Sequence, residues 1–147
     1  MKIREAYRAD AETIIAFQQN MAMETEGMEL GYSTISGGVM AVFNDPSKGT
    51  YFVAESDNKV VASLLITPEW SDWRNSYIWW FQSVYVIAEQ RRKGIFREMY
   101  AFIKEAAHKK NIPGLRLYVE KDNIKAQKTY EALGMNSRHY QLFEWMK

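Results

Sequence analysis

The chain has no cysteine and is poor in histidine. Its 147 residues contain no Cys and only two His, His108 and His139. The absence of thiols excludes disulfide bonds, thiolate zinc sites and a cysteine nucleophile. Two histidines are too few for a histidine-rich metal site, so we expect no bound metal.

Long hydrophobic runs are also missing. No apolar stretch approaches the ~20 residues that a membrane-spanning helix needs. The first residues carry Lys2, Arg4 and Glu5 and lack the apolar core of a signal peptide. We therefore expect a cytoplasmic protein with no membrane partner.

Neither sign of charge dominates the sequence. There are 19 Lys and Arg against 18 Asp and Glu, which gives a net charge of +1. A dedicated nucleic-acid binder usually carries a strong basic excess, so we expect no nucleic-acid partner. Locally, residues 89–110 hold seven basic and three acidic side chains, and residues 21–30 hold Glu24, Glu26 and Glu29 with no basic residue. Charge alone fits two solvated patches as well as it fits one anionic and one cationic ligand, and a nucleic-acid-binding domain that uses the basic segment stays open as an alternative.

Hydrophobic residues make up 47% of the chain and aromatic residues 14%, enough to build the core of one domain over residues 1–147. The periodicity predicts helices over roughly residues 10–23, 35–43, 94–110 and 123–133. Strands are expected at residues 3–7, 51–55, 60–67, 77–87 and 115–120, with a last strand or hairpin in the tail, residues 137–146. Asp57 and Asn58, between the second and third of these strands, are suited to a tight hairpin turn. The order βααβββαβαβ predicts an α+β fold with helices on the faces of one mixed sheet, in which the strands before and after the third helix are parallel.

The most informative segment is residues 84–96, where a strand leads through a basic turn into a long helix. The turn contains Arg91, Arg92 and Lys93, and Gly94 stands where the helix begins. The free N–H groups and the positive dipole end of a helix N-terminus suit a phosphate, and a glycine lets the ligand approach the backbone. Many such junctions carry Gly and Arg for structural reasons only, so this segment alone leaves both interpretations open.

This segment resembles the acetyl-CoA pyrophosphate loop of the GNAT superfamily of N-acetyltransferases, whose motif is Gln/Arg-x-x-Gly-x-Gly/Ala. Its first five positions are occupied by Arg91, Arg92, Lys93, Gly94 and Ile95. The sixth position, normally Gly or Ala, holds the bulky Phe96. Because backbone donors are present whatever the side chain, the resemblance still implies pyrophosphate binding at this turn.

A second segment is similar to a later block of the same family, Asn-x-x-Ala-x-x-x-Tyr-x-x-x-Gly-Phe. It contains Asn123, Ala126, Tyr130, Gly134 and Met135 in that spacing. In relatives the Asn contacts the pantetheine arm of acetyl-CoA and the Tyr hydroxyl lies beside the thioester sulfur. Taken separately, Asn123 reads equally well as a helix cap and Tyr130 as a core aromatic.

The resemblance implies a single GNAT-like domain whose central mixed sheet of six to seven strands is flanked by four helices. It further implies an N-acetyltransferase that uses acetyl-CoA as co-substrate and transfers acetyl by direct attack of a primary amine. Tyr130 is the expected proton donor to the leaving thiolate. Backbone N–H groups of the splayed strand are expected to hold the thioester and pantetheine, at Val84, Tyr85 and Val86.

The general base and the acceptor are less constrained by the sequence. Glu26 and Glu24 are the preferred candidates for the base, because the helix pair on the substrate side of this family lines the amine pocket; Asp72, Gln82 and Glu120 are alternatives. The acidic loop with Glu24, Glu26 and Glu29 and the Trp-flanked loop with Asp72 are both expected to border the cleft opposite the CoA. Four tryptophans are candidates for the walls of a pocket for a cationic amine: Trp70, Trp73, Trp79 and Trp80. For Trp79 or Trp80, whichever faces inward, core packing is the favoured role. A non-catalytic module that binds CoA or another protein is the alternative function, and a homodimer is left open.

Overall fold

The computed structural model describes residues 1–147, and the chain divides into two compact units, Met1–Leu117 and Tyr118–Lys147. The first unit holds every strand and three of the four α-helices. Its elements are, in chain order, β1 (Lys2–Glu5), the 3-10 helix η1 (Arg8–Asp10), α1 (Ala11–Glu26), α2 (Tyr32–Asn44), β2 (Thr50–Ser56), β3 (Lys59–Ser71), β4 (Ser76–Val86), the 3-10 helix η2 (Ala88–Gln90), α3 (Ile95–Lys109) and β5 (Leu115–Leu117). The second unit contains α4 (Ile124–Ala132).

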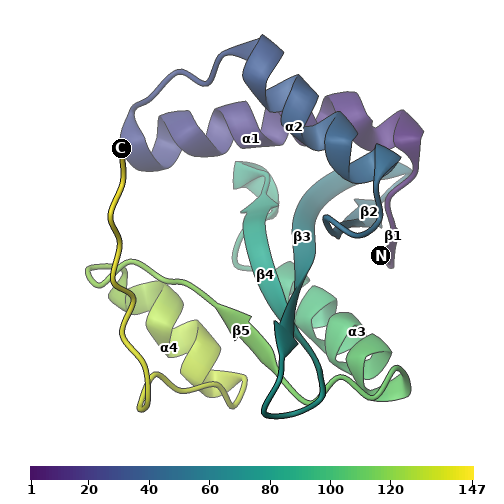
Figure 1. Cartoon of the computed structure of the whole chain (residues 1–147). Coiled ribbons are helices and arrows are strands. Elements are labelled where there is room, and N and C mark those ends of the chain that lie inside the picture. Colours follow the sequence, from purple (N-terminus) through teal and green to yellow (C-terminus); the bar gives the residue numbers. More distant parts are fainter. The chain divides into compact units, whose positions relative to one another are not determined.

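The sheet of the first unit follows chain order, β1-β2-β3-β4-β5 (Figure 1). Neighbouring strands are antiparallel except β4 and β5, which are parallel. The chain must therefore cross over between β4 and β5, and α3 forms that connection, as the sequence predicted. The expected α+β class is confirmed, but the expected six to seven strands are wrong, because the sheet has five.

Two places along the β2–β3 pair depend on residues that accept a positive φ. Between β2 and β3, Asp57 and Asn58 have φ of 52° and 60°, as the two central positions of a type I′ turn require. This confirms the predicted hairpin. At the start of β2, Gly49 has a φ of 152°, and a Cβ there would lie 2.7 Å from the carbonyl oxygen of Ile66. Only glycine allows β2 and β3 to meet so closely at this end.

Opposite faces of the sheet carry separate parts of the core. Tyr51 and Val53 of β2 belong to a buried cluster with Ile14 of α1 and Val39 of α2. Phe52, which alternation places on the other face, packs against Phe102 of α3 with ring centroids 6.0 Å apart. The first two helices therefore cover one face and α3 covers the other (Figure 1).

Arg4 of β1 ties the N-terminus to the rest of the sheet. Its guanidinium contacts the carboxylates of Asp10 at 2.8 Å and Glu55 at 2.7 Å, and its side chain is only 10% exposed. The Asp10 carboxylate also accepts from the N–H of Tyr7 at 2.7 Å. Asp10 stands at the N-cap position of α1, but its side chain makes no hydrogen bond to that helix.

The second unit has one helix and an extended tail. The carboxamide of Asn123 accepts from the N–H of Ala126 at 3.1 Å and so caps α4. Gly134 follows the helix with a φ of 93°. The strand or hairpin expected at residues 137–146 is wrong, because the unit offers no strand with which the tail can pair. The tail instead leaves large apolar side chains exposed, among them Tyr140, Leu142, Phe143, Trp145 and Met146.

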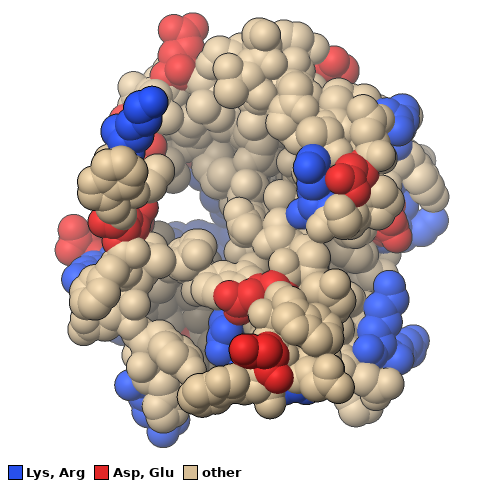
Figure 2. Space-filling view, in the orientation of Figure 1, with Lys and Arg blue, Asp and Glu red and all other residues tan.

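None of the helices is both long and apolar enough to cross a membrane. On the face drawn in Figure 2, acidic and basic side chains are interspersed. No group of three or more His, Asp or Glu side chains is arranged to hold a metal ion.

Candidate active site

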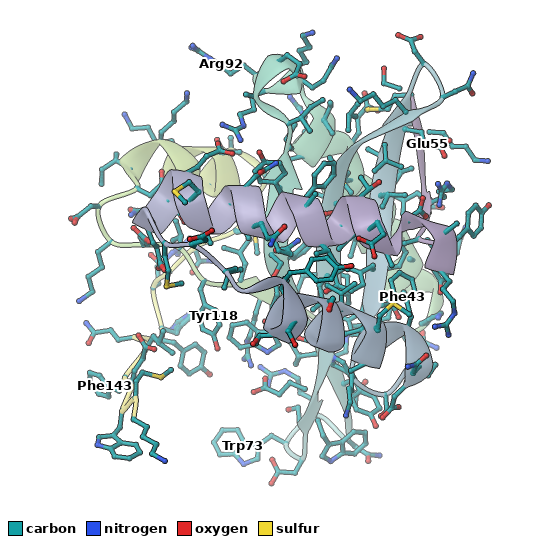
Figure 3. All side chains as sticks on the ribbon, turned by 90° about the horizontal axis from the view of Figure 1, so that it is seen from above. Phe43, Glu55, Trp73, Arg92, Tyr118 and Phe143 are labelled. Atoms are coloured by element: carbon teal, nitrogen blue, oxygen red, sulfur yellow. The ribbon has the colours of Figure 1, made fainter.

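The turn between β4 and α3, residues 87–94, is called the phosphate turn below. It begins where β4 ends at Val86, passes through η2 and bends sharply, with Arg92 in the left-handed region at a φ of 66°. Arg92 stands on the loop at one end of β4 (Figure 3). Lys93 Nζ donates to the Gln90 side chain at 3.5 Å, so this basic side chain stays within the turn.

Gly94 sets the direction of α3. Its φ is 80°, and a Cβ built on it would meet nothing within 4 Å. The glycine is therefore required by backbone conformation and not by crowding. No side chain caps the helix that follows. The first N–H groups of α3, from Ile95 and Phe96 onward, are thus left for an anion at the positive end of the helix dipole.

Phe96 directs its bulk into the core. Its ring lies 6.0 Å from that of Phe81 on β4 and 6.3 Å from that of Tyr100 one turn along α3. Phe81 and Tyr100 are themselves stacked, with centroids 5.7 Å apart. The residue that departs from the family motif therefore completes an aromatic cluster between α3 and the sheet.

The end of β4 is irregular and paired on one side only within the first unit. Its pairing with β5 stops at Phe81 and Leu117, while its pairing with β3 continues to Val86. The register shifts on the way, and Ser83 has a φ of 53°. The N–H of Ile87 donates to Val61 of β3. Successive residues of a strand direct their N–H and C=O groups to opposite edges. The backbone groups of Val84 and Val86 therefore face the open edge, and those of Tyr85 face β3.

Tyr85, Arg91 and Glu24 meet at this end of β4. The hydroxyl of Tyr85 donates to Glu24 Oε2 at 2.5 Å, and Arg91 Nη2 donates to Glu24 Oε1 at 2.6 Å. Arg91 Nε also donates to the carbonyl oxygen of Val86 at 2.8 Å, and the guanidinium lies 5.3 Å from the centre of the Tyr85 ring. Phe17, two turns before Glu24 on α1, packs on the same ring at 5.2 Å. We call Glu24, Tyr85 and Arg91 the clamp.

The clamp changes the acid–base character of its members. Hydrogen bonds from Tyr85 and Arg91 lower the pKa of Glu24 below its usual value. Burial, together with the neighbouring Glu24 carboxylate, raises the pKa of Tyr85. A carboxylate that is held ionised by two donors has little tendency to take a proton, so this geometry does not favour Glu24 as a general base.

Glu26 is placed differently from Glu24. Both residues were expected in a loop, but they lie in the last turn of α1, which ends at Gly27 with a φ of 59°. Two residues along a helix point about 200° apart, so Glu26 faces away from Tyr85. The Glu26 side chain is exposed and has no hydrogen bond to the clamp. Of the three acidic residues in this part of the chain, only Glu29 lies in the loop between α1 and α2.

The structure separates the acidic end of α1 from the tryptophan-flanked turn. Asp72 and Trp73 form the tip of the β3–β4 hairpin, where Trp73 is 94% exposed. Figure 3 shows Trp73 and Arg92 at opposite ends of the molecule's long strand pair. Glu24 contacts the Arg92 end, so the expectation that Asp72 and the acidic residues of α1 border one cleft is wrong.

The remaining side chains proposed on β4 make cross-strand contacts. Trp80 Nε1 donates to Glu69 Oε1 at 3.2 Å, and Arg116 of β5 donates to the same oxygen at 2.9 Å. Gln82 donates to Thr67 Oγ1 at 2.7 Å. The sequence analysis missed Glu69 and Arg116, because no local pattern reveals which residues of two other strands flank a tryptophan. Trp79 instead lies beneath the ammonium of Lys110 at 5.9 Å.

Within the second unit, Asn123 and Tyr130 both belong to α4 and its cap. The Asn123 side chain has the capping role that was one of its two interpretations. Tyr130 is half-buried, and burial raises the pKa of its hydroxyl. The hydroxyl therefore keeps its proton at neutral pH. Glu120 precedes the helix, and its backbone carbonyl accepts from Asn123 N–H and from the Gln127 side chain.

A pocket of about 500 Å³ opens beside the clamp, between α1, the β2–β3 turn and the start of the phosphate turn. None of the active-site residues predicted from the sequence lines it. Its lining combines polar and apolar side chains, from Thr13, Phe17, Asn20, Asn58, Lys59, Val60, Ile87 and Glu89.

Solved structures with the same fold include several acetyltransferases. A possible acetyltransferase from Clostridium difficile 630 is 48% identical, covers 99% of this chain and 97% of its own, and superposes with a TM-score of 0.92. A predicted acetyltransferase with acetyl-CoA from Clostridium acetobutylicum is 16% identical, over 97% and 95% of the two chains, with a TM-score of 0.76. The aminoglycoside antibiotic 6′-N-acetyltransferase from Acinetobacter haemolyticus is 15% identical, over 100% and 99%, with a TM-score of 0.75. The last two show likeness of fold alone.

No curated protein matches the chain significantly. The family model described as the acetyltransferase (GNAT) family matches residues 13–135 and so extends over both compact units. The chain belongs to the GNAT acetyltransferase family.

Proposed function

We propose that this protein is an N-acetyltransferase that moves the acetyl group of acetyl-CoA to a primary amine by direct attack. The observation that carries the proposal is the phosphate turn. Gly94 in the left-handed conformation leads into an uncapped helix, next to a strand whose outer edge is open at Val84 and Val86. Family membership supports acetyl transfer and the use of acetyl-CoA in general.

The first N–H groups of α3 bind the pyrophosphate in this proposal, and the positive end of the helix dipole adds to the attraction. Arg92 and Lys93 contribute positive charge from the turn. The backbone N–H groups of Val84 and Val86 bind the pantetheine and the thioester carbonyl along the open edge of β4, while the Val86 carbonyl oxygen stays with Arg91. Asn123 contacts the pantetheine arm, on the strength of the family resemblance.

The reaction forms one C–N bond and breaks one C–S bond. A neutral amine attacks the thioester carbonyl carbon, the carbonyl oxygen becomes an oxyanion, and collapse of the intermediate expels the CoA thiolate. The amine loses a proton to a base, and the thiolate gains one. Tyr130 is our proposed donor of that second proton. Its hydroxyl is protonated at neutral pH, as a proton donor must be; burial raises its pKa further and so adds no acid strength.

We assign the acceptor side to the acidic end of α1. Glu26 is solvent-exposed and has both oxygens available, so it binds a cationic amine or accepts its proton in this proposal. A cluster of negatively charged side chains attracts an ammonium group and repels carboxylates. Glu24 is assigned a different role, which is argued in the next subsection.

Release of free CoA tests the proposal directly. Because the chain has no cysteine, a thiol reagent detects CoA without a signal from the protein. We expect acetyl-CoA consumption that requires an added amine, in a panel of polyamines, aminoglycosides, lysine-bearing peptides and acidic amino acids. Binding of acetyl-CoA without turnover on any amine would instead identify a non-catalytic CoA-binding module.

A further inference from the structure

The clamp joins three elements that are remote in sequence. Glu24 is 61 residues from Tyr85 and 67 residues from Arg91. It connects the C-terminal part of α1 with the end of β4 and with the phosphate turn. The contact is supported from below by a stripe of α1, because Phe17, Asn20 and Glu24 are three and four residues apart and so share one helix face. Phe17 packs on the Tyr85 ring, and Asn20 hydrogen-bonds its side chain.

Arg91 occupies the first position of the pyrophosphate motif, yet its contacts lead away from a phosphate. Its Nε is held by the carbonyl oxygen of Val86, and its Nη2 is held by Glu24. The same guanidinium therefore closes the phosphate turn onto the strand that precedes it. A planar fork with separate donors suits both contacts at once, whereas a lysine ammonium on a flexible stem lacks this fixed geometry.

We infer that Glu24 is a positioning residue for acetyl-CoA binding: through Arg91 it holds the phosphate turn against the end of β4 and so presets the N-terminus of α3 for the pyrophosphate. This inference rests on the proposed function. Glu24 touches neither the acceptor nor the cofactor in this role. Its carboxylate acts entirely through Arg91 and Tyr85.

Charge and positioning predict opposite changes in acetyl-CoA affinity when Glu24 is neutralised. A carboxylate near a pyrophosphate site repels the ligand, so neutralising it should tighten binding if only charge mattered. A positioning role predicts the reverse, because loss of Glu24 releases the Arg91 fork and the turn with it. The direction of the change in affinity therefore separates the two explanations.

The clamp also links the two substrates. Glu24 lies two residues before Glu26 and three before Gly27, where α1 ends. A ligand that orders the end of α1 therefore favours the ordered phosphate turn, and a ligand that orders the turn favours an ordered end of α1. By thermodynamic reciprocity, an acceptor bound at α1 and acetyl-CoA bound at the turn should each raise the affinity for the other.

The test is calorimetric titration of acetyl-CoA into the full chain and its variants. We expect Glu24→Gln to raise the Kd about fivefold, a typical size for coupling between sites. Arg91→Lys keeps a positive charge for the phosphate but loses the fork, and should weaken binding to a similar extent. The double variant Glu24→Gln/Arg91→Lys should be no weaker than the weaker single variant, because both changes open the same contact. Glu89→Gln is the matched control, since it removes one acidic charge from the phosphate turn without touching the clamp.

Unchanged or tighter binding by Glu24→Gln would overturn the inference, as would full affinity in Arg91→Lys or multiplicative effects in the double variant. Hydrogen exchange without ligand gives an independent readout. Amides of residues 91–97 should exchange faster in Glu24→Gln than in the natural protein or in Glu89→Gln, and equal protection would also overturn the inference. If the natural protein bound no acetyl-CoA at all, the proposed function would fail, while the exchange experiment would still decide whether Glu24 holds the turn.

Discussion

Phe96, in the first turn of α3, lies edge-on against Phe81 of β4, with ring centroids 6.0 Å apart and an interplanar angle of 68°. This pair explains how a bulky residue occupies a position of the pyrophosphate motif that normally holds Gly or Ala. The ring packs beneath the helix, against the sheet. The backbone N–H groups of the same turn do not depend on the side chain.

Phe96→Ala should therefore lower stability more than cofactor affinity. Removing a half-buried ring from an aromatic cluster should reduce the free energy of unfolding by about 2 kcal/mol. The Kd for acetyl-CoA should change less than about threefold, because the backbone donors remain. Urea denaturation and calorimetric titration measure the two effects. A Kd that falls tenfold in this variant would mean that the ring obstructs the pyrophosphate.

Two substitutions of Gly94 distinguish backbone strain from charge. Gly94→Ala forces a Cβ onto a φ of 80°, which should cost about 1 kcal/mol of stability. Gly94→Glu carries a similar strain but also a negative charge at the helix N-terminus. If the pyrophosphate binds there, Gly94→Glu should weaken acetyl-CoA binding at least about tenfold more than Gly94→Ala, because one charge at close range costs 1.4 kcal/mol or more. Equal affinities in the two folded variants would place the pyrophosphate elsewhere.

The sequence predicted the parts of the fold that depend on local residue patterns. The I′ turn at Asp57 and Asn58, the helix after Gly94 and the strand before it are each dictated by neighbouring residues. The tail was mispredicted because its many aromatic and apolar residues are typical of a strand, whereas a strand also requires a partner.

In the candidate site, too, one part depends on consecutive residues and another on tertiary packing. The phosphate turn was predictable because its glycine and basic residues are consecutive. The contact between Glu24 and Arg91 was not, since the two side chains are 67 residues apart and each was assigned separately to a substrate. Only the packing of α1 across the end of β4 brings them together. That packing also converts Glu24 from a candidate base into a partner of Arg91.

Tyr130→Phe tests the proposed proton donor. The substitution keeps the ring and deletes only the hydroxyl, so acetyl-CoA affinity should be nearly unchanged. A general acid typically contributes about 10²–10⁴-fold, and kcat should fall by that range if the chemical step limits turnover. Steady-state kinetics with the best amine of the panel, together with calorimetric titration, check both parts. A decrease of less than about threefold would leave Tyr130 a packing residue.

The ion cluster of Arg4 should control acid stability. Burial alone raises the pKa of Asp10, but hydrogen bonds from Arg4 and from the Tyr7 amide outweigh it, and the pKa lies below its usual value. A depressed carboxyl pKa contributes stability above the unfolded value of about 4, and this is lost as pH falls through the folded pKa. Arg4→Gln should lower the free energy of unfolding at pH 7 by about 2 kcal/mol, since two carboxylates lose their common partner.

The same variant should lose less stability between pH 7 and pH 3 than the natural protein does. Removing Arg4 takes away the contact that depressed the pKa of Asp10, so less stability remains to be lost in acid. Urea denaturation at a series of pH values measures this difference. Parallel pH profiles for the two proteins would show that the cluster contributes nothing in that range.

Glu26→Gln tests the acidic end of α1 as the acceptor site. The carboxylate is exposed, belongs to no hydrogen bond with the clamp, and lies three residues before Glu29 of the following loop. Removing its charge should raise the KM for a cationic amine, or lower kcat if Glu26 accepts the proton, by about three- to tenfold for one partly solvated charge pair. The KM for acetyl-CoA should stay nearly constant, in contrast to Glu24→Gln, which acts on the cofactor side. Glu105→Gln, the same charge change on α3 across the sheet, is the control for net charge. Preference of the natural enzyme for acidic acceptors, or equal kinetics in Glu26→Gln and Glu105→Gln, would remove the acceptor from this end of α1 while leaving acetyl transfer itself in place.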